Sequence, residues 1–248
     1  MQEAPRTPPR PAVPGAPRVL ARAQATLDRV DFARNPYLVA LADGSMPLEA
    51  FRATQEQFFF AVEFFSRPMA ALVARIPDPD RRLDVLHNVL EEHGELDPAR
   101  FHVTTFRAFL TAIGADPARL VTLELWPEVR AFNSVLLTAC VHDELEVGVA
   151  CMGIVEQAFA GISAAIGRSV VARGWVPAGR LVHYKLHEEI DERHAEEFYR
   201  VIEPRWDQGP LYPETAALPR RYWIEQGLEL GAYVFDRLYR DLWTRARA

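Results

Sequence analysis

The segment 179–204 carries two histidines and an aspartate at spacings that place them on one face of a helix. His187, Asp191 and His194 follow one another at intervals of four and three residues. At about 100 degrees per residue, these intervals keep the three side chains within about 60 degrees of arc. Imidazole and carboxylate groups arranged in this way are suitable ligands for iron or manganese. The spacing therefore predicts one wall of a metal site.

The same helical wheel places this wall on the apolar side of the helix. The apolar residues on or beside it are Tyr184, Ile190, Phe198, Val201 and Ile202. The charged residues that gather on the opposite side are Lys185, Glu189, Glu192, Glu196 and Arg200. Burying imidazoles and a carboxylate is costly unless they are paired or bind a metal, so the pattern favours a buried metal site over a set of surface residues.

Two further carboxylates stand alone in apolar surroundings. Glu156 is the only charged residue in VGVACMGIVEQAFAGISAAIG, and Glu63 is the only one in FFFAVEFFS. A salt bridge to a buried arginine would explain either of them separately. One site shared with the wall of the 179–204 helix explains both together, and we expect both carboxylates to be metal ligands.

The segment NVLEEHGELDPARFH supplies the remaining candidates. Glu92 closes one predicted helix before Gly94, and His102 lies about one turn into the next predicted helix. The competitors for Glu92 that spacing alone does not exclude are Glu91, His93 and Glu95. The other histidines, which we interpret as structural or surface residues, are His87, His142 and His183.

Together the candidates form a self-consistent ligand set, namely Glu63, Glu92, His102, Glu156, His187, Asp191 and His194. The four carboxylates balance the four positive charges of two ferrous ions, and three neutral imidazoles complete a mixed nitrogen and oxygen shell. A ferritin-like bundle would carry two Glu-x-x-His motifs, and the sequence has none. The site is therefore expected on a different helical scaffold.

The elements that must hold these residues are helices. Breaks rich in glycine and proline separate seven long segments without period-two alternation, at roughly 47–76, 80–93, 98–113, 123–142, 143–168, 179–203 and 218–246. Such segments predict an all-α bundle around one core, which we expect to be a single domain over residues 18–248. Residues 1–17 contain six prolines and are expected to be a flexible leader. Pro68 is expected to kink or divide its helix.

Composition excludes several other classes of protein. The chain of 248 residues is 49% hydrophobic and carries a net charge of −6 without a basic block, which argues against binding to nucleic acid. No apolar run approaches the length of a membrane span, and Cys140 and Cys151 are expected to be reduced and buried, so we expect a cytoplasmic protein. The 218–246 helix is a candidate homodimer surface, although packing in the core explains its apolar stripe equally well.

With these motifs the chain resembles the heme-oxygenase-like di-iron oxidases and oxygenases, which share a structural superfamily with thiaminase II and pyrroloquinoline quinone synthase. The motifs that carry the resemblance, over roughly residues 30–205, are Glu92, His102, Glu156 and the terminal His187, Asp191 and His194. The resemblance implies a seven-helix heme-oxygenase-like fold, two Fe ions and dioxygen as co-substrate. It also selects Glu92 over its acidic neighbours. True heme oxygenase is disfavoured because no histidine precedes His87.

The resemblance also suggests a reaction. Members that oxygenate nitrogen tend to add a seventh ligand, a carboxylate from an earlier core helix, and Glu63 is expected to fill that role. The expected activity is N-oxygenation of a small-molecule amine or amino acid to a hydroxylamino, nitroso or nitro product, with an external electron donor. The alternatives are an oxidative decarboxylase or desaturase, in which Glu63 binds an ammonium group or pairs with an arginine, a metal-free enzyme like thiaminase II, and a non-catalytic interaction protein.

Overall fold

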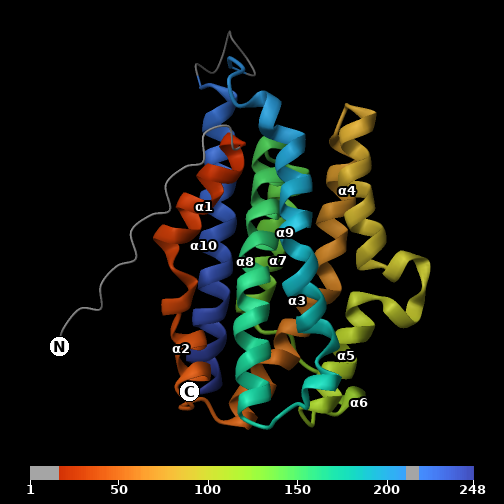
Figure 1. Cartoon of the computed structure of the whole chain (residues 1–248), viewed down its shortest axis with the longest axis vertical. Coiled ribbons are helices and arrows are strands. Elements are labelled where there is room, and N and C mark those ends of the chain that lie inside the picture. Colours follow the sequence, from red (N-terminus) through yellow and green to blue (C-terminus); the bar gives the residue numbers. More distant parts are fainter. Residues whose placement is uncertain (1–16, 211–217) are drawn as a thin grey trace, which may run out of the picture.

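The chain folds into a bundle of α-helices, which the computed structural model describes for residues 17–210 and 218–248 (Figure 1). These residues form ten α-helices and no β-strand, so the all-α prediction is confirmed. The helices are α1 (Arg18–Val30), α2 (Pro36–Ala42), α3 (Leu48–Arg75), α4 (Pro79–Glu92), α5 (His102–Ala112), α6 (Pro117–Leu120), α7 (Pro127–Val141), α8 (Leu145–Ala172), α9 (Val182–Ile202) and α10 (Arg220–Ala246). The predicted leader lies, apart from Pro17, outside the described residues.

Each of the seven long segments expected from the sequence corresponds to one helix, from α3 to α10 without the short α6. The segment expected at 98–113 becomes helical only at His102, because Asp97 and Pro98 begin a 3-10 turn in which Asp97 accepts a hydrogen bond from the amide of Ala99. Of the two outcomes expected at Pro68, a kink or a division of the helix, the division does not occur, since α3 runs through this residue as one helix.

Helix α8 lies in the middle of the bundle, with α9 on one side and α10 on the other (Figure 1). Glycines bring these helices close together. A Cβ atom on Gly153 of α8 would lie 2.6 Å from the ring of Tyr199 on α9, and one on Gly231 of α10 would lie 2.6 Å from the carbonyl oxygen of Cys151 on α8. A larger residue at Gly231 would collide with the backbone of α8, and one at Gly153 would collide with the side chain of Tyr199, so both glycines allow the close packing of these helices.

The apolar character of α8 belongs to a core helix. Its length and composition would suffice to cross a membrane, but 78% of its most apolar window is buried inside the bundle. Cys151 on this helix and Cys140 on α7 are both free and buried, as predicted. The apolar stripe expected in the 218–246 segment lies on α10 and also packs into the core, since its residues Ile224 and Leu228 are fully buried.

A buried ion pair fixes the start of α8 to the segments around it. Glu146, in the first turn of α8, has no exposed surface and lies 2.8 Å from the guanidinium of Arg205, just beyond α9. Arg220, the first residue of α10, pairs with the same carboxylate. Both arginines outweigh the effect of burial and lower the pKa of Glu146 below its ordinary value.

Candidate metal centre

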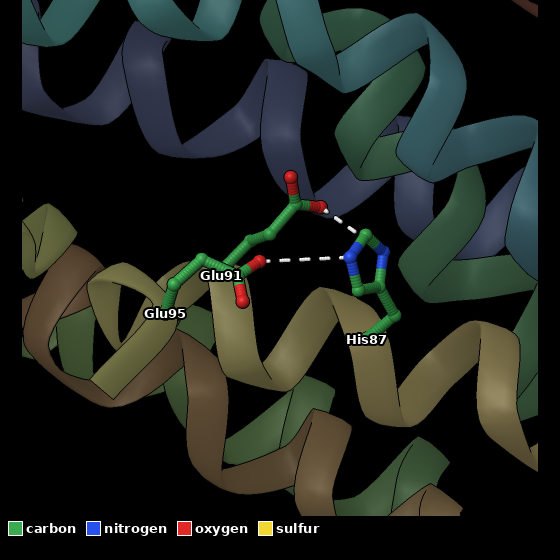
Figure 2. Close-up of side chains that lie close together, drawn as sticks. All are labelled: His87, Glu91 and Glu95. Carbon is green, nitrogen blue, oxygen red and sulfur yellow. Dashed lines mark ion pairs between the residues drawn. The ribbon is translucent and has the colours of Figure 1, made fainter. Parts of the chain in front are cut away.

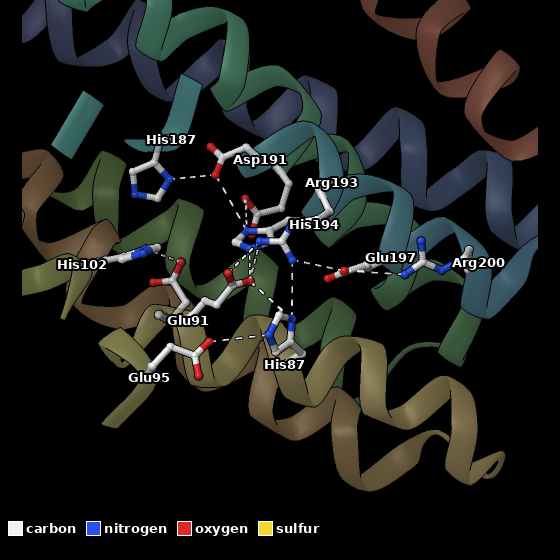
Figure 3. Close-up of polar contacts among 12 residues, drawn as sticks. His87, Glu91, Glu95, His102, His187, Asp191, Arg193, His194, Glu197 and Arg200 are labelled. Carbon is white, nitrogen blue, oxygen red and sulfur yellow. Dashed lines mark hydrogen bonds and ion pairs between the residues drawn. The ribbon is translucent and has the colours of Figure 1, made fainter. Parts of the chain in front are cut away.

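Helix α9 presents the predicted wall to the inside of the bundle. His187 is 5% exposed, and Asp191 and His194 have no exposed surface. The opposite face of the helix carries exposed Lys185 and Glu192. The amphipathic arrangement predicted from the helical wheel is therefore confirmed, and the three side chains face the helices on the other side of the site (Figure 3).

Three other predicted residues approach this wall from neighbouring helices. Glu156 comes from the middle of α8 and is 1% exposed, while Glu92 is the last residue of α4. His102 is the first residue of α5, one turn earlier in its helix than expected, because two 3-10 turns separate α4 from α5. The Nδ1 atom of His102 lies 2.8 Å from Oε1 of Glu92, so the short connection brings the pair together.

The deepest part of the site has the dimensions of a metal position. One potential ligand atom from each of Glu156, Asp191 and His194 lies within 4.8 Å of the other two. In each of the three residues, one side-chain oxygen or nitrogen is buried without a hydrogen-bond partner among the described residues, namely Oε1 of Glu156, Oδ2 of Asp191 and Nδ1 of His194. Buried polar atoms almost always have a partner, so three residues that cluster and each have such an atom fit a bound cation.

A second group of ligand types lies directly beside the first. The rings of His102 and His187 have their centroids 4.5 Å apart, and Glu92 pairs with His102. Asp191 links the two groups, since its Oδ1 atom lies 2.8 Å from Nδ1 of His187 and 3.8 Å from Nδ1 of His194. Six of the seven predicted residues thus form two adjoining trios that share one wall.

The electrostatics of the site without a metal are unfavourable for its carboxylates. Burial, reinforced by the negative charge of Asp191, raises the pKa of Glu156 to about 7. Burial also raises the pKa of Asp191 well above its ordinary value. Burial opposes protonation of His194, but the carboxylates of Glu156 and Glu91 outweigh it and raise the pKa of this imidazole to about 10. A divalent cation would reverse this situation, because it stabilises the ionised carboxylates and the neutral imidazole.

Glu63 does not join the cluster, and the prediction of a buried carboxylate at this position is wrong. Its side chain is 42% exposed and lies 3.5 Å from the guanidinium of Arg107 on α5. The neighbours of Glu63 in the sequence are apolar, but its own direction from α3 is toward solvent. The structure instead shows an ion pair between Glu63 and an arginine, which is one of the alternatives considered from the sequence.

Glu91 is the site residue that sequence reasoning left undecided. Its Oε2 atom lies 2.8 Å from Nε2 of His194, and its carboxylate also binds Arg193 at 2.6 Å. Despite partial burial, His194 and Arg193 lower the pKa of Glu91 to about 2, so it accepts the proton of Nε2 as a carboxylate. This contact leaves Nδ1 of His194 directed at Glu156 and Asp191, which is how a carboxylate orients a metal-binding histidine.

A separate group of possible ligands, His87, Glu91 and Glu95, lies on the outer side of the site. His87 is 3.5 Å from both Glu91 and Glu95, and the side chains of His87 and Glu95 are nearly half exposed (Figure 2). The guanidinium of Arg193 lies 3.5 Å from the same imidazole. A fixed positive charge at this place opposes a metal ion, so the outer group forms an ion-pair network.

Two more buried polar residues flank the centre. His183 is 1% exposed, and its ring centroid lies 4.4 Å from that of His187. Asn88 lies one turn before Glu92 on α4 and is completely buried, and neither polar atom of its side chain has a hydrogen-bond partner in the described part of the chain. The sequence showed His183 on the same arc as His187, whereas Asn88 carried no signal.

A pocket leads to the centre between α3, α7, α8 and α10. The space between its walls is about 420 Å³, which includes open solvent. Its lining is aromatic and aliphatic except at one end, where Glu92, Glu156 and His187 reach it. The remaining lining residues are Phe58, Ala61, Val62, Phe65, Phe132, Val155, Phe159 and Phe235. The arrangement can therefore bring a small molecule against the metal-binding residues.

Comparison with known proteins agrees with this geometry. Residues 52–217 match the model of a protein family described as iron-containing redox enzymes. The chain is 26% identical over 199 residues to the 4-aminobenzoate synthase of Nitrosomonas europaea, a match covering 76% of this chain and 79% of the relative. It is 24% identical over 168 residues to the 4-aminobenzoate synthase of Chlamydia trachomatis, covering 67% and 71% of the two chains.

Solved structures show the same fold. A TenA homologue from Pseudomonas syringae has a TM-score of 0.72 at 17% identity and covers 98% of this chain and 99% of its own. A domain from Shewanella denitrificans with a heme-oxygenase-like fold has a TM-score of 0.68 at 15% identity, covering 92% and 90%. The expected heme-oxygenase-like fold is confirmed.

Proposed function

Because this chain belongs to the family of iron-containing redox enzymes, we propose that it is a dioxygen-dependent di-iron oxygenase acting on a small-molecule amine. Membership of the family makes it an oxidoreductase. The observation that carries the finer proposal is the buried trio of Glu156, Asp191 and His194, in which ligand atoms lie within 4.8 Å of one another and each side chain has one buried polar atom without a partner among the described residues. The adjoining trio of Glu92, His102 and His187 would hold the second iron.

Iron bound here would supply the reduction of dioxygen and the transfer of one oxygen atom, and the protein residues would bind and orient it. Asp191 lies between the two trios and is suited to contact both ions. Glu91 would hold His194 in the tautomer whose Nδ1 lone pair faces the metal. The pocket would exclude bulk water from the reacting atoms through its apolar walls.

N-oxygenation is the reaction we favour. One oxygen atom of dioxygen joins the amine nitrogen to give a hydroxylamine, the other leaves as water, and an external donor supplies two electrons together with two protons. Two relatives named 4-aminobenzoate synthase support an amine of a small molecule as the reacting group. The outward position of Glu63 weakens the support that the sequence gave to this reaction, so the proposal rests on the relatives and the pocket.

Oxidative cleavage of a carbon–carbon bond is the second candidate. The observation that favours it is the outward position of Glu63, which leaves six candidate ligands, the number expected for members that cleave such bonds. In this reaction the enzyme would act as a decarboxylase or desaturase on a fatty or amino acid.

Anaerobic titration with Fe(II), followed by isotope-labelled dioxygen and mass spectrometry, tests both the cofactor and the reaction. We expect two Fe(II) per chain, and a hydroxylamino, nitroso or nitro product that carries the label. Release of an alkene or aldehyde without nitrogen oxidation would favour the second candidate. Binding of no iron, or retention of iron by a variant lacking both Glu156 and His194, would contradict the proposed centre.

We further propose a cytoplasmic location, which the free, buried Cys140 and Cys151 support. The two electrons would come from a separate donor protein or small reductant. We also propose a homodimer through α10, which the exposed hydrophobic side chain of Tyr233 on this helix supports.

A further inference from the structure

We propose that His183 and Thr105 form a buried link between α9 and α5, which positions the two imidazoles of the second metal position. That position is the one that Glu92, His102 and His187 would hold, so this inference rests on the proposed function. Three observations support the link: the hydrogen bonds of Thr105, the packing of the His183 ring, and the lack of another polar contact between α5 and α9 among the described residues.

Thr105 connects the side chain of His183 to the backbone of His102. His102 is the first residue of α5, and the hydroxyl of Thr105, about one turn later, donates a hydrogen bond of 2.9 Å to its carbonyl oxygen. The same hydroxyl oxygen lies 3.0 Å from Nδ1 of His183 on α9. The two contacts thus run from α9 through Thr105 to the residue that carries a candidate ligand.

The direction of these hydrogen bonds determines where the proton of His183 lies. A hydroxyl has one proton, and that of Thr105 is donated to His102. Nδ1 of His183 must therefore be the donor in its contact with Thr105. The ring is 1% exposed, and its Nε2 atom has no hydrogen-bond partner in the described part of the chain. A second proton would leave a buried charge unpaired, so the imidazole is neutral and carries its proton on Nδ1.

The contact between His183 and Thr105 is the only side-chain hydrogen bond or ion pair that joins α5 to α9 within residues 17–210 and 218–248. His102 forms its own hydrogen bond with Glu92 of α4, and His187 forms one with Asp191 of the same helix. Neither of these hydrogen bonds sets the distance between α5 and α9. Apolar contacts between the helices are non-directional, so the link through Thr105 is the directional contact that places one imidazole against the other.

The ring of His183 also packs against the other candidate ligand. It lies about one turn before His187 on α9, and the two ring centroids are 4.4 Å apart. It contacts Phe106 of α5 edge-to-face as well, with centroids 4.8 Å apart. The ring of His187 lies in turn 4.5 Å from that of His102. His183 therefore supports one imidazole directly and the other through Thr105.

The first metal position provides an internal control. Its trio comes from two helices, with Glu156 on α8 and with Asp191 and His194 on α9. No residue of α5 belongs to it, so loosening α5 from α9 should leave this trio in place. A histidine that only stabilised the fold would instead affect both positions alike. The ratio of the two metal affinities therefore distinguishes positioning from general stabilisation.

Thr105→Val tests the link, because it removes the hydroxyl and keeps a side chain of similar shape. We expect the second position to bind Mn(II) about tenfold more weakly, as when a ligand loses an orienting partner, and the first to keep its affinity. Equilibrium dialysis against Mn(II) measures both dissociation constants, and His102→Ala identifies the one that belongs to the second position. An unchanged ratio of the two dissociation constants would overturn the proposal.

Thr111→Val is the matched control on the same helix. The hydroxyl of Thr111 donates to the carbonyl oxygen of Arg107 within α5, and the residue is exposed. The change therefore removes a hydroxyl from α5 without touching the link to α9, and both dissociation constants should stay as they are. The same tenfold loss in this variant would show that the effect does not come from the link.

Two substitutions of His183 separate its proton from its ring. Asparagine has an amide N–H that can donate to Thr105 in place of Nδ1, whereas phenylalanine keeps a ring and has no donor. We expect His183→Asn to retain more of the second affinity than His183→Phe, with circular dichroism and thermal unfolding without metal showing that both are folded. If His183→Phe binds the second ion as tightly as His183→Asn, or more tightly, the hydrogen bond does not position the site.

These measurements need no turnover, so they separate this inference from the proposed function. Two bound metal ions with the expected order of affinities, but without oxygen-dependent activity after loading with Fe(II), would refute the proposed function and leave the link intact. If His102→Ala alters neither dissociation constant, the second metal position is refuted, and the positioning role of His183 is refuted with it.

Discussion

Metal binding should stabilise the folded protein through the buried trio. The perturbation is anaerobic addition of Fe(II), or of Mn(II) as a substitute that does not react with oxygen. Oε1 of Glu156, Oδ2 of Asp191 and Nδ1 of His194 are buried without partners among the described residues. Each such atom costs about 1 to 3 kcal/mol, so coordination of all three can recover about 3 to 9 kcal/mol of folding free energy.

The expected shift in the unfolding temperature depends on the concentration of free metal. At a free metal concentration one hundred times the dissociation constant, binding to the folded state stabilises it by about 2.7 kcal/mol. For a protein of this size, each kcal/mol raises the unfolding temperature by about 2 to 4 °C, so we expect a rise of about 5 to 11 °C. Differential scanning calorimetry with and without metal measures it.

Two variants show whether the shift comes from this centre. Glu156→Gln keeps the size of the side chain, removes its negative charge and should abolish most of the shift. Glu63→Gln changes a carboxylate that is 42% exposed and should keep the full shift. If Glu156→Gln is stabilised by metal as much as the unchanged protein, or if Glu63→Gln is not stabilised, our placement of the metal is wrong.

Four further outcomes are expected. His194→Ala should abolish iron-dependent turnover while circular dichroism shows a helical fold, because one ligand is lost but apolar packing dominates stability; full activity would contradict the assignment. Glu63→Gln should keep its turnover with the amine substrate, and a loss would restore Glu63 as a ligand. Glu91→Gln should weaken metal binding about 10 to 100 fold in equilibrium dialysis, as expected for a residue that orients a ligand; unchanged affinity would refute that role. The pKa of Glu146 in the folded protein lies below its ordinary value of 4.5, so its ion pairs stabilise the fold above pH 4.5 and this contribution is lost as the pH falls further. Thermal unfolding of Glu146→Gln should therefore show lower stability at pH 7 and a weaker decline below pH 4.5 than the unchanged protein, and parallel pH profiles would contradict this.

The parts of the site that the sequence predicts well are those where one helix determines the outcome. On α9 polar and apolar residues alternate with helical periodicity, so the buried face is defined by α9 itself and contains His187, Asp191 and His194. On α8 nearly every side chain is apolar, so the sequence predicts that Glu156 is buried whichever face of the helix it lies on.

The parts that fail depend on neighbouring helices. The residues around Glu63 are apolar on several sides of α3, so the sequence does not define which side faces the core. In the structure it points to solvent and pairs with Arg107 of α5. Glu91 and Glu92 point about 100 degrees apart on the same helix, and only the positions of α5 and α9 show that each meets a different histidine. The pocket likewise combines residues from six helices.

In this protein the residues that determine helix packing around α8 differ from the residues that line the pocket. Gly153 and Gly231 allow α9 and α10 to pack closely against α8, and Glu156 lies only three residues beyond Gly153. The phenylalanines that line the pocket have no part in these glycine contacts. Substitutions among those that do not touch a metal-binding residue can thus change which molecule is accepted, whereas Phe159, whose ring centroid lies 5.0 Å from that of His187, also supports the metal centre. Such a scaffold is a favourable starting point for laboratory evolution of new substrate ranges, provided that libraries vary the pocket and leave the glycines unaltered.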